Sequence, residues 1–308
     1  MSGSVAFRHE ALMYAGESGF VSGTLPFIRD GLAVDEPMLV VVSKEKIDLL
    51  RQGLGRDADA VHFADMAGVG NNPARIIPAW SDFVNENPGR RLRGIGEPIW
   101  AGRSSAELIE CQRHESLLNV AFAEAPAWWL LCPYDTDSLA PDVIAEARRS
   151  HPFVAHGCTH SESLDYRGLD RSGEPFDAPL PAAPVDCPEI EFGAGPMQPV
   201  RAFVAQHAGT DLGPERVADL ILAVTEVATN SVRYGGGHGA MRIWRDDNAL
   251  ICEVRDHGHL EYPLVGRRRP AIDTVEGRGI WLVHQLCDLV QIRSYASGTV
   301  VRMHTWIR

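Results

Sequence analysis

The stretch PERVADLILAVTEVATNSVRY, residues 214–234, decides the fold of the C-terminal part of the chain. Its apolar residues recur at spacings of three and four, which predicts an amphipathic helix with one buried stripe. The stripe consists of Val217, Leu220, Ile221, Val224 and Ala228. At about 100° per residue, Glu226 and Asn230 project together on the other side of the helix, one turn apart, and Arg233 shares that side. A solvated helix face would explain this pattern if it stood alone.

Two later motifs make a solvated face a poorer explanation. Asp256-His257-Gly258 ends a branched apolar strand, where an acid before a glycine turn is unexpected. Gly277-Arg278-Gly279-Ile280, preceded by Glu276, opens a predicted helix, and the N–H groups at a helix N-terminus favour phosphate. The order E-x-x-x-N, D-x-G, G-x-G, with steps of 30 and 21 residues between Glu226, Asp256 and Gly277, is hard to obtain by chance.

These motifs resemble the histidine-kinase-type (GHKL, Bergerat) ATP-binding fold. TEVATNS, residues 225–231, resembles its N box, Asp256-His257-Gly258 its first glycine box and Gly277–Ile280 its second. Within that superfamily the short domain, about residues 188–308, resembles the anti-sigma-factor serine kinases of bacterial partner-switching systems. The resemblance implies an α+β sandwich of the Bergerat type that binds ATP and Mg²⁺.

The resemblance also implies roles for individual residues. Asn230 would bind Mg²⁺, Glu226 would be the general base, and Asp256 would accept a hydrogen bond from the adenine amino group. The backbone of three glycines would line the nucleotide pocket: Gly258, Gly277 and Gly279. Arg233 and Arg278 suit phosphate, because guanidinium matches its geometry. His259-Leu260 depart from the family pattern, in which a second small residue often follows the aspartate.

Composition limits the classes of function. The 308 residues hold 41 acids and 29 bases, a net charge of −12, so no uniform basic field exists to bind nucleic acid. The apolar runs 37–42 and 127–132 are far shorter than the ~20 residues that cross a bilayer, and we expect no signal peptide and no membrane association. Six cysteines without a CxxC pair indicate reduced thiols in a cytoplasmic protein.

A proline- and glycine-rich stretch over residues 167–199 divides the chain. We predict a first domain at 1–165, a linker at 166–187 and a second domain at 188–308. In the first domain, branched apolar runs at 38–43, 60–65, 92–98 and 128–132 alternate with helical spacings, which predicts an α/β fold with a mainly parallel sheet. In the second, helices at 199–206, 214–234 and 279–287 accompany strands at 189–192, 240–245, 250–256, 290–295 and 299–307, which predicts a mainly antiparallel sheet.

The first domain, over about residues 6–155, resembles the MEDS sensory domain. The matching segments are FRHEALMY (7–14), PF (26–27), GL (31–32), NP (72–73), GEP (96–98), HE (114–115), LN (118–119) and CPYD (132–135). The resemblance implies a RecA-like or KaiC-like fold that has lost its phosphate loop, and a small ligand that it does not identify. The segment 16–24 has no lysine, so we do not expect ATP there.

Several residues of this first domain are candidates for facing a ligand: His9, Tyr14, Glu97, Trp100, His114, Tyr134 and Asp135. Glu97 and Asp135 follow apolar strands, where α/β pockets form, although such acids also cap helices or pair with arginines. Glu115 and Asn119 repeat the E-x-x-x-N spacing without the later motifs, so we expect a buried polar pair. Two small groups could also bind a metal, Cys111 with His114, or His156 with Cys158 and His160.

The sequence thus predicts a two-domain bacterial signalling protein. Its C-terminal domain would be an anti-sigma factor that phosphorylates a serine of an anti-anti-sigma (STAS-type) antagonist, and homodimers are usual among proteins that resemble it. The alternative is an ATP-gated module that sequesters a partner without turnover. A histidine kinase would need a dimerising helical hairpin where this chain has its proline-rich linker.

Overall fold

The computed structural model describes residues 7–125, 127–157, 159–270 and 277–307. The chain divides into two compact units, Met1–Phe176 and Asp177–Arg308, and the boundary lies inside the proline-rich segment. Residues on either side of it are attached to their own unit. The Arg167 guanidinium forms two 2.9 Å hydrogen bonds with Glu146 in the first unit, and Arg302 donates to the Pro181 carbonyl in the second.

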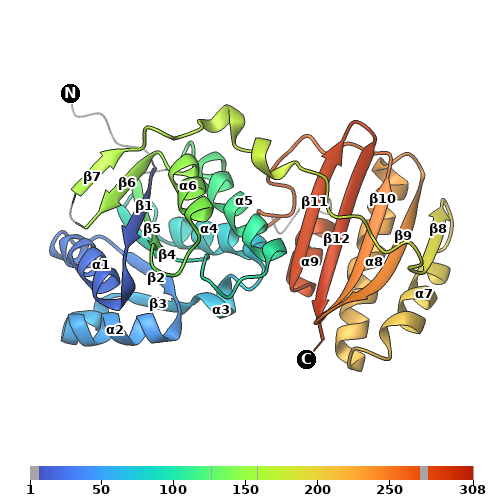
Figure 1. Cartoon of the computed structure of the whole chain (residues 1–308), viewed down its shortest axis with the longest axis horizontal. Helices are drawn as coiled ribbons and strands as arrows, with labels where there is room; N and C mark the ends of the chain where they lie inside the picture. The colour runs from blue at the N-terminus through green and yellow to red at the C-terminus, as the bar shows by residue number, and fades with distance from the viewer. Residues whose placement is uncertain (1–6, 126, 158, 271–276, 308) are drawn as a thin grey trace. The chain divides into compact units, whose positions relative to one another are not determined.

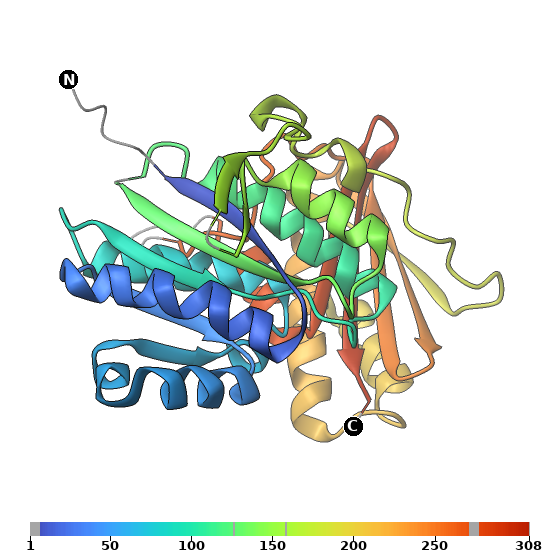
Figure 2. The same ribbon diagram turned by 60° about the vertical axis from the view of Figure 1, so that its left-hand side comes forward.

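The first unit is a seven-stranded sheet in the order β3-β2-β4-β5-β1-β6-β7, parallel except for the β6–β7 pair. Figures 1 and 2 show α1 and α2 on one face and α5 and α6 on the other. The strands are β1 (Arg8–Tyr14), β2 (Met38–Val42), β3 (His62–Asp65), β4 (Leu92–Gly96), β5 (Trp128–Asp135), β6 (Phe153–His156) and β7 (Thr159–Glu162). The helices are α1 (Gly16–Ala33), α2 (Lys44–Leu54), α3 (Met66–Val69), α4 (Ile76–Glu86), α5 (Ser105–Ala121) and α6 (Pro141–Ser150), with short 3-10 turns at 55–60, 73–75, 169–171 and 174–176.

Helix α5 shows how the sequence sets these elements. Ser104 and Glu107 form a capping box, in which each side chain bonds the other residue's backbone N–H, so the helix begins at Ser105. The predicted parallel α/β arrangement is confirmed, and the strands β1, β6 and β7 are additions to it. β1 was not predicted because Arg8, His9 and Glu10 make its first half polar.

The second unit is an antiparallel five-stranded sheet in the order β11-β12-β10-β9-β8, with helices packed on one face. The strands are β8 (Glu189–Gly193), β9 (His238–Asp246), β10 (Ala249–Asp256), β11 (Leu289–Tyr295) and β12 (Gly298–Trp306), and the helices are α7 (Gln198–Ala208), α8 (Pro214–Tyr234) and α9 (Arg278–Leu286). The predicted mainly antiparallel sheet with helices is confirmed. The strands alternate, so that every second residue faces the helices.

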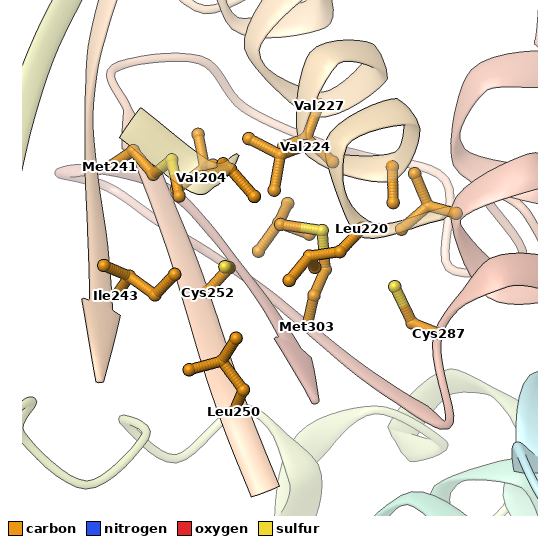
Figure 3. Close-up of a cluster of buried hydrophobic side chains, with 14 of the residues drawn as sticks. Val204, Leu220, Val224, Val227, Met241, Ile243, Leu250, Cys252, Cys287 and Met303 are labelled. Carbon is orange, nitrogen blue, oxygen red and sulfur yellow. The ribbon is translucent and has the colours of Figure 1, made fainter. Parts of the chain in front are cut away.

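The core of the second unit lies between α8 and this sheet (Figure 3). Leu220 and Val224 of α8 are fully buried against Cys252 of β10 and Met303 of β12. Val217 and Ile221 of the predicted stripe also pack against this cluster. This face fixes the rotation of α8, and it leaves the opposite side of the helix for Glu226 and Asn230.

Candidate functional site

Helix α8 supplies the acid and the amide of the candidate site. Its buried side carries Val224, Val227 and Ala228, whereas Glu226 and Asn230 are half-buried and lie one turn apart. Pro214 stands at the first helical position, where its missing N–H costs nothing, and Gly235 follows the last residue. A carboxylate and a carboxamide are therefore held together on a rigid element.

The N-terminus of α9 lies against these two side chains. A Cβ atom placed on Gly279 would be 2.9 Å from Glu226 Oε2, closer than real Cβ atoms pack, and 3.1 Å from Asn230 Nδ2, closer than most of them pack. Gly277, just before the helix, has a φ of 83°, which favours glycine. The two positions of this motif are therefore glycine for different reasons. Gly277 lets the chain turn into α9, and Gly279 leaves room beside the carboxylate and the amide.

Asp256 is fixed at the end of β10 by two donors. Ser231 Oγ of α8 donates to Asp256 Oδ2 at 2.6 Å, and the backbone N–H of Gly258 donates to Oδ1 at 2.8 Å. Gly235 packs on the same carboxylate, because a Cβ there would lie 2.5 Å from Asp256 Cγ. Asp256 thus faces the C-terminal end of α8 with a defined orientation, and each oxygen keeps a lone pair for a further donor.

The departure at His259-Leu260 is accommodated outside this site. Ser294 of β11 accepts the backbone N–H of Leu260 at 2.9 Å and lies 3.0 Å from His259 Nδ1. Thr299 of β12 donates to the Gly258 carbonyl at 2.9 Å. The larger residues after Asp256-His257-Gly258 are therefore directed to the neighbouring strands, and the turn at Gly258 is preserved.

The arginines differ in exposure. Arg233 and Arg278 are exposed at the ends of α8 and α9, as phosphate partners would need to be. In the arginine run 267–269, Arg267 is buried, while Arg268 and Arg269 are exposed. Gly266 just before this run packs on α9, where its Cβ would lie 2.5 Å from Ile280 Cγ2. Glu276 lies outside the described residues.

The residues present fit a magnesium nucleotide. An amide oxygen and phosphate oxygens are hard ligands of the kind that Mg²⁺ takes. The first turn of α9 presents backbone N–H groups beside the space that Gly279 leaves open, and such a helix start attracts phosphate. Asp256 is an oriented acceptor beside the same helix end.

In the first unit, three of the predicted ligand-facing residues meet at the carboxyl ends of the parallel strands. Tyr14 donates to Glu97 Oε1 at 2.6 Å, and Asp135 follows at the end of β5. Lys46 of α2 reaches both, at 2.6 Å from Tyr14 Oη and from each oxygen of Glu97. Burial raises the pKa of Glu97, although the Lys46 ammonium and the Tyr14 hydroxyl act to lower it.

This group is satisfied within the chain. Asp135 accepts the backbone N–H of Gly16 at 3.2 Å and of Asp137 at 3.1 Å, and the hydroxyl of Ser138 at 2.9 Å. Burial and the Glu97 carboxylate raise the pKa of Tyr14, so the phenol stays protonated. The two acids therefore follow the alternative interpretation. Asp135 accepts hydrogen bonds from backbone N–H groups, and Glu97 forms an ion pair with Lys46 rather than with an arginine.

The other candidates of the first unit lie elsewhere. His9, His114 and Tyr134 are at most 1% exposed, inside the unit, and burial raises the pKa of Tyr134. Trp100 lies at the surface, with the Arg103 guanidinium 3.8 Å from its ring centroid. The expected buried pair of Glu115 and Asn119 is confirmed: Glu115 Oε2 lies 3.1 Å from His9 Nε2, and Asn119 Oδ1 3.0 Å from His9 Nδ1.

The two small groups that could bind a metal, Cys111 with His114 and His156 with Cys158 and His160, stay predictions. The Cys111 thiol donates to the Pro98 carbonyl at 3.4 Å, and the pair with His114 belongs to no group of three metal-binding side chains among the described residues. His160 instead lies 2.9 Å from Glu10, and Cys158 falls outside the described residues. Burial raises the pKa of the Cys111 thiol to about 12, so it stays protonated.

The structure adds residues that the sequence did not indicate. Ser231 and Gly235 orient Asp256, and Lys46 neutralises Glu97. Ser231 directly follows Asn230 and Lys46 follows a predicted strand, but serines and lysines at such positions are common. His151, which joins Glu115 and His9, had no local signal at all.

Residues 194–305 match the family model described as a histidine kinase-like ATPase domain. The second unit is therefore a histidine kinase-like ATPase domain. Residues 8–152 match the MEDS model, the methanogen/methylotroph DcmR sensory domain. The chain thus carries a MEDS domain followed by a histidine kinase-like ATPase domain.

No curated protein matches the chain. Among solved structures, the histidine kinase AdeS of Acinetobacter baumannii aligns with 11% identity and a TM-score of 0.25, over 40% of this chain and 70% of that chain. In the described part of the chain, no helix combines the length and the apolar character needed to cross a membrane.

Proposed function

We propose that the chain is a signalling regulator whose ATPase domain binds Mg²⁺–ATP and phosphorylates a serine of an anti-anti-sigma, STAS-type antagonist. The phosphorylation state of the antagonist would then determine whether a sigma factor is held or released. We further propose that the MEDS domain, a RecA-like or KaiC-like fold without a phosphate loop, controls this output in response to a small ligand. The regulator would act in the cytoplasm as a homodimer.

One observation supports the nucleotide site most strongly. Gly279 at the start of α9 leaves its Cβ position empty beside both Glu226 Oε2 and Asn230 Nδ2. Two motifs separated by some fifty residues in sequence are therefore in contact in space. This contact places an amide and a carboxylate beside the positive end of a helix. The amide oxygen can ligate a metal ion and the helix end can bind phosphate, as a phosphate–metal group requires.

Each residue has a chemical task in this proposal. Asn230 would ligate Mg²⁺, which neutralises phosphate charge when bound, and Asp256 would accept the adenine amino group. Glu226 accepts the proton of the serine hydroxyl as the oxygen becomes nucleophilic. Arg233 and Arg278 would contact phosphate oxygens, and the backbone at Gly258, Gly277 and Gly279 would line the pocket. Positioning and charge neutralisation dominate phosphoryl transfer, so this set suffices.

The replacement Glu226→Gln tests the base. Glutamine keeps the size of the side chain but cannot accept the proton, so transfer from ATP to the purified antagonist should fall about 10²- to 10³-fold. Binding of Mg²⁺–ATP should change by less than about threefold. The matched control is Glu215→Gln, an exposed glutamate in the first turn of the same helix, which should leave both measurements unchanged.

The outcomes separate the two functions. Undiminished transfer in Glu226→Gln would remove the general base from the proposal. A wild-type protein that binds ATP and captures its partner, yet transfers no phosphate and hydrolyses none, would instead identify an ATP-gated sequestration module.

A further inference from the structure

Four metal-binding side chains converge inside the MEDS domain. His9 lies on β1, Cys132 on the neighbouring strand β5, Glu115 on α5 and His151 directly after α6. Their ligand atoms all lie within 4.8 Å of one another, and none of the four residues is more than 1% exposed. The parallel register pairs Ala11 with Cys132, which places His9 and Cys132 on the same face of the sheet.

The proton of each histidine is already committed on the far side of its ring. Asn119 donates its amide to the Ser150 carbonyl at 2.7 Å, so its oxygen must accept from His9 Nδ1 at 3.0 Å. His151 Nδ1 lies 2.8 Å from the Ala147 carbonyl, which can only accept. In the neutral tautomers that follow, both Nε2 atoms carry lone pairs.

Both lone pairs point at the Glu115 carboxylate, which is itself an acceptor. Both Nε2 atoms lie 3.1 Å from the same carboxylate oxygen, Glu115 Oε2, and Cys132 Sγ lies 3.4 Å from His9 Nε2. Glu115 Oε1 has no hydrogen-bond partner among the described residues. Buried acceptors that face one another are costly unless a cation lies between them.

Protons are the competing occupant, and here they are disfavoured. The two imidazole rings have centroids 3.9 Å apart and planes tilted by 38°, so protonation of both would place two cations side by side in the core. One divalent ion satisfies all the lone pairs at once.

The donor set indicates which ion. Imidazole, thiolate and carboxylate together suit a transition metal of intermediate softness, whereas Mg²⁺ and Ca²⁺ prefer oxygen ligands alone. A tetrahedral Zn²⁺ site with bonds of about 2.0–2.3 Å separates its ligand atoms by about 3.4 Å, close to the 3.1 and 3.4 Å seen here. The bonds from Nδ1 to Asn119 and to the Ala147 carbonyl are those that orient histidine ligands.

We propose that His9, Glu115, Cys132 and His151 bind a Zn²⁺ ion, in a closed structural site that joins β1 and β5 to α5 and α6. Four protein ligands without an open position make a structural rather than a catalytic site. This inference concerns the MEDS domain alone and is independent of the nucleotide site in the second unit.

Metal content and cobalt spectroscopy of the full chain test the site. Protein purified without chelators should contain one zinc ion per chain by elemental analysis. The metal-free protein, reloaded with Co²⁺, should show the intense visible bands of tetrahedral cobalt and a thiolate charge-transfer band. Cys132→Ser should lose the charge-transfer band and bind zinc at least about tenfold more weakly. Cys111→Ser, which alters an equally buried thiol of the same domain, should keep both.

A wild-type chain that is folded by circular dichroism, contains no transition metal and gives no cobalt bands would overturn the proposal, and the cluster would then be a buried proton network. That result needs no variant, so a failure of Cys132→Ser to fold leaves the test intact. Equal loss of zinc in Cys111→Ser and Cys132→Ser would also contradict the assignment.

Discussion

Gly279 is the residue on which the candidate nucleotide site depends most visibly. Its missing side chain is the space that Glu226 and Asn230 border, and its N–H belongs to the first turn of α9. The resemblance to the second glycine box accounts for a glycine at position 279. The structure explains why it is needed, because any Cβ would press on the carboxylate and the amide.

Gly279→Ala should therefore weaken Mg²⁺–ATP binding by about tenfold or more while the domain remains folded, since alanine is compatible with the helix. Equilibrium dialysis or titration calorimetry measures the affinity. Gly195→Ala is the control, because a Cβ there meets nothing within 4 Å, and it should bind as the wild type does. Equal affinities in the two variants would show that the space beside Gly279 is not used.

At the scale of elements, Lys46 joins α2 to the ends of β1 and β4 through Tyr14 and Glu97. Lys46→Met should cost about 2–3 kcal/mol of unfolding free energy, because it leaves the buried Glu97 carboxylate without its cation. Lys44→Met is the control: its ammonium is 78% exposed and 3.7 Å from Asp65, so little stability should be lost. Urea unfolding of both variants measures this.

The loss in Lys46→Met should depend on pH. Burial already raises the pKa of Glu97, so in the folded state this carboxyl takes up a proton more readily than in the unfolded chain. Its contribution to stability is then largest at low pH and falls as pH rises above 4.5 through the raised pKa. The variant should be closer to wild type at pH 5 than at pH 8. A loss that is the same at both would contradict the role of Glu97.

Many of the helices and strands could be predicted from the sequence. The boundaries of the elements in the second unit were predicted to within two residues, because amphipathic spacing and hairpin turns are local signals. β1 was not, since His9 and Glu10 are polar although they lie in the middle of a sheet. The ATPase motifs form a fixed series along the chain. By contrast, the proposed metal ligands are brought together only by the parallel topology of the sheet, and no spacing in the sequence predicts the group. They are His9, Glu115, Cys132 and His151.

At the scale of the whole molecule, each unit has a core of its own. Leu50 belongs to the core of the first unit and Val224 to that of the second, and both are 0% exposed. We expect two calorimetric transitions. Val224→Ala should reduce the unfolding free energy of one unit by about 2 kcal/mol and so lower the temperature of its transition. Leu50→Ala should do the same to the other unit, by about 3 kcal/mol. Mg²⁺–ATP should raise only the transition that Val224→Ala lowers.

A single transition that both variants shift equally would contradict two separately stabilised units. Stabilisation by Mg²⁺–ATP of the transition that Leu50→Ala lowers would place the nucleotide in the MEDS domain instead.

Titration calorimetry of Mg²⁺–ATP into wild type, Asn230→Ala and Asn248→Ala tests the central claim most directly. The wild type should bind one nucleotide per chain, and Asn248→Ala, which changes an exposed turn residue, should match it. Asn230→Ala should bind at least about tenfold more weakly, and this difference should vanish when Mg²⁺ is chelated. Equal affinities for all three proteins, with the same dependence on Mg²⁺, would contradict a magnesium nucleotide held between α8 and α9.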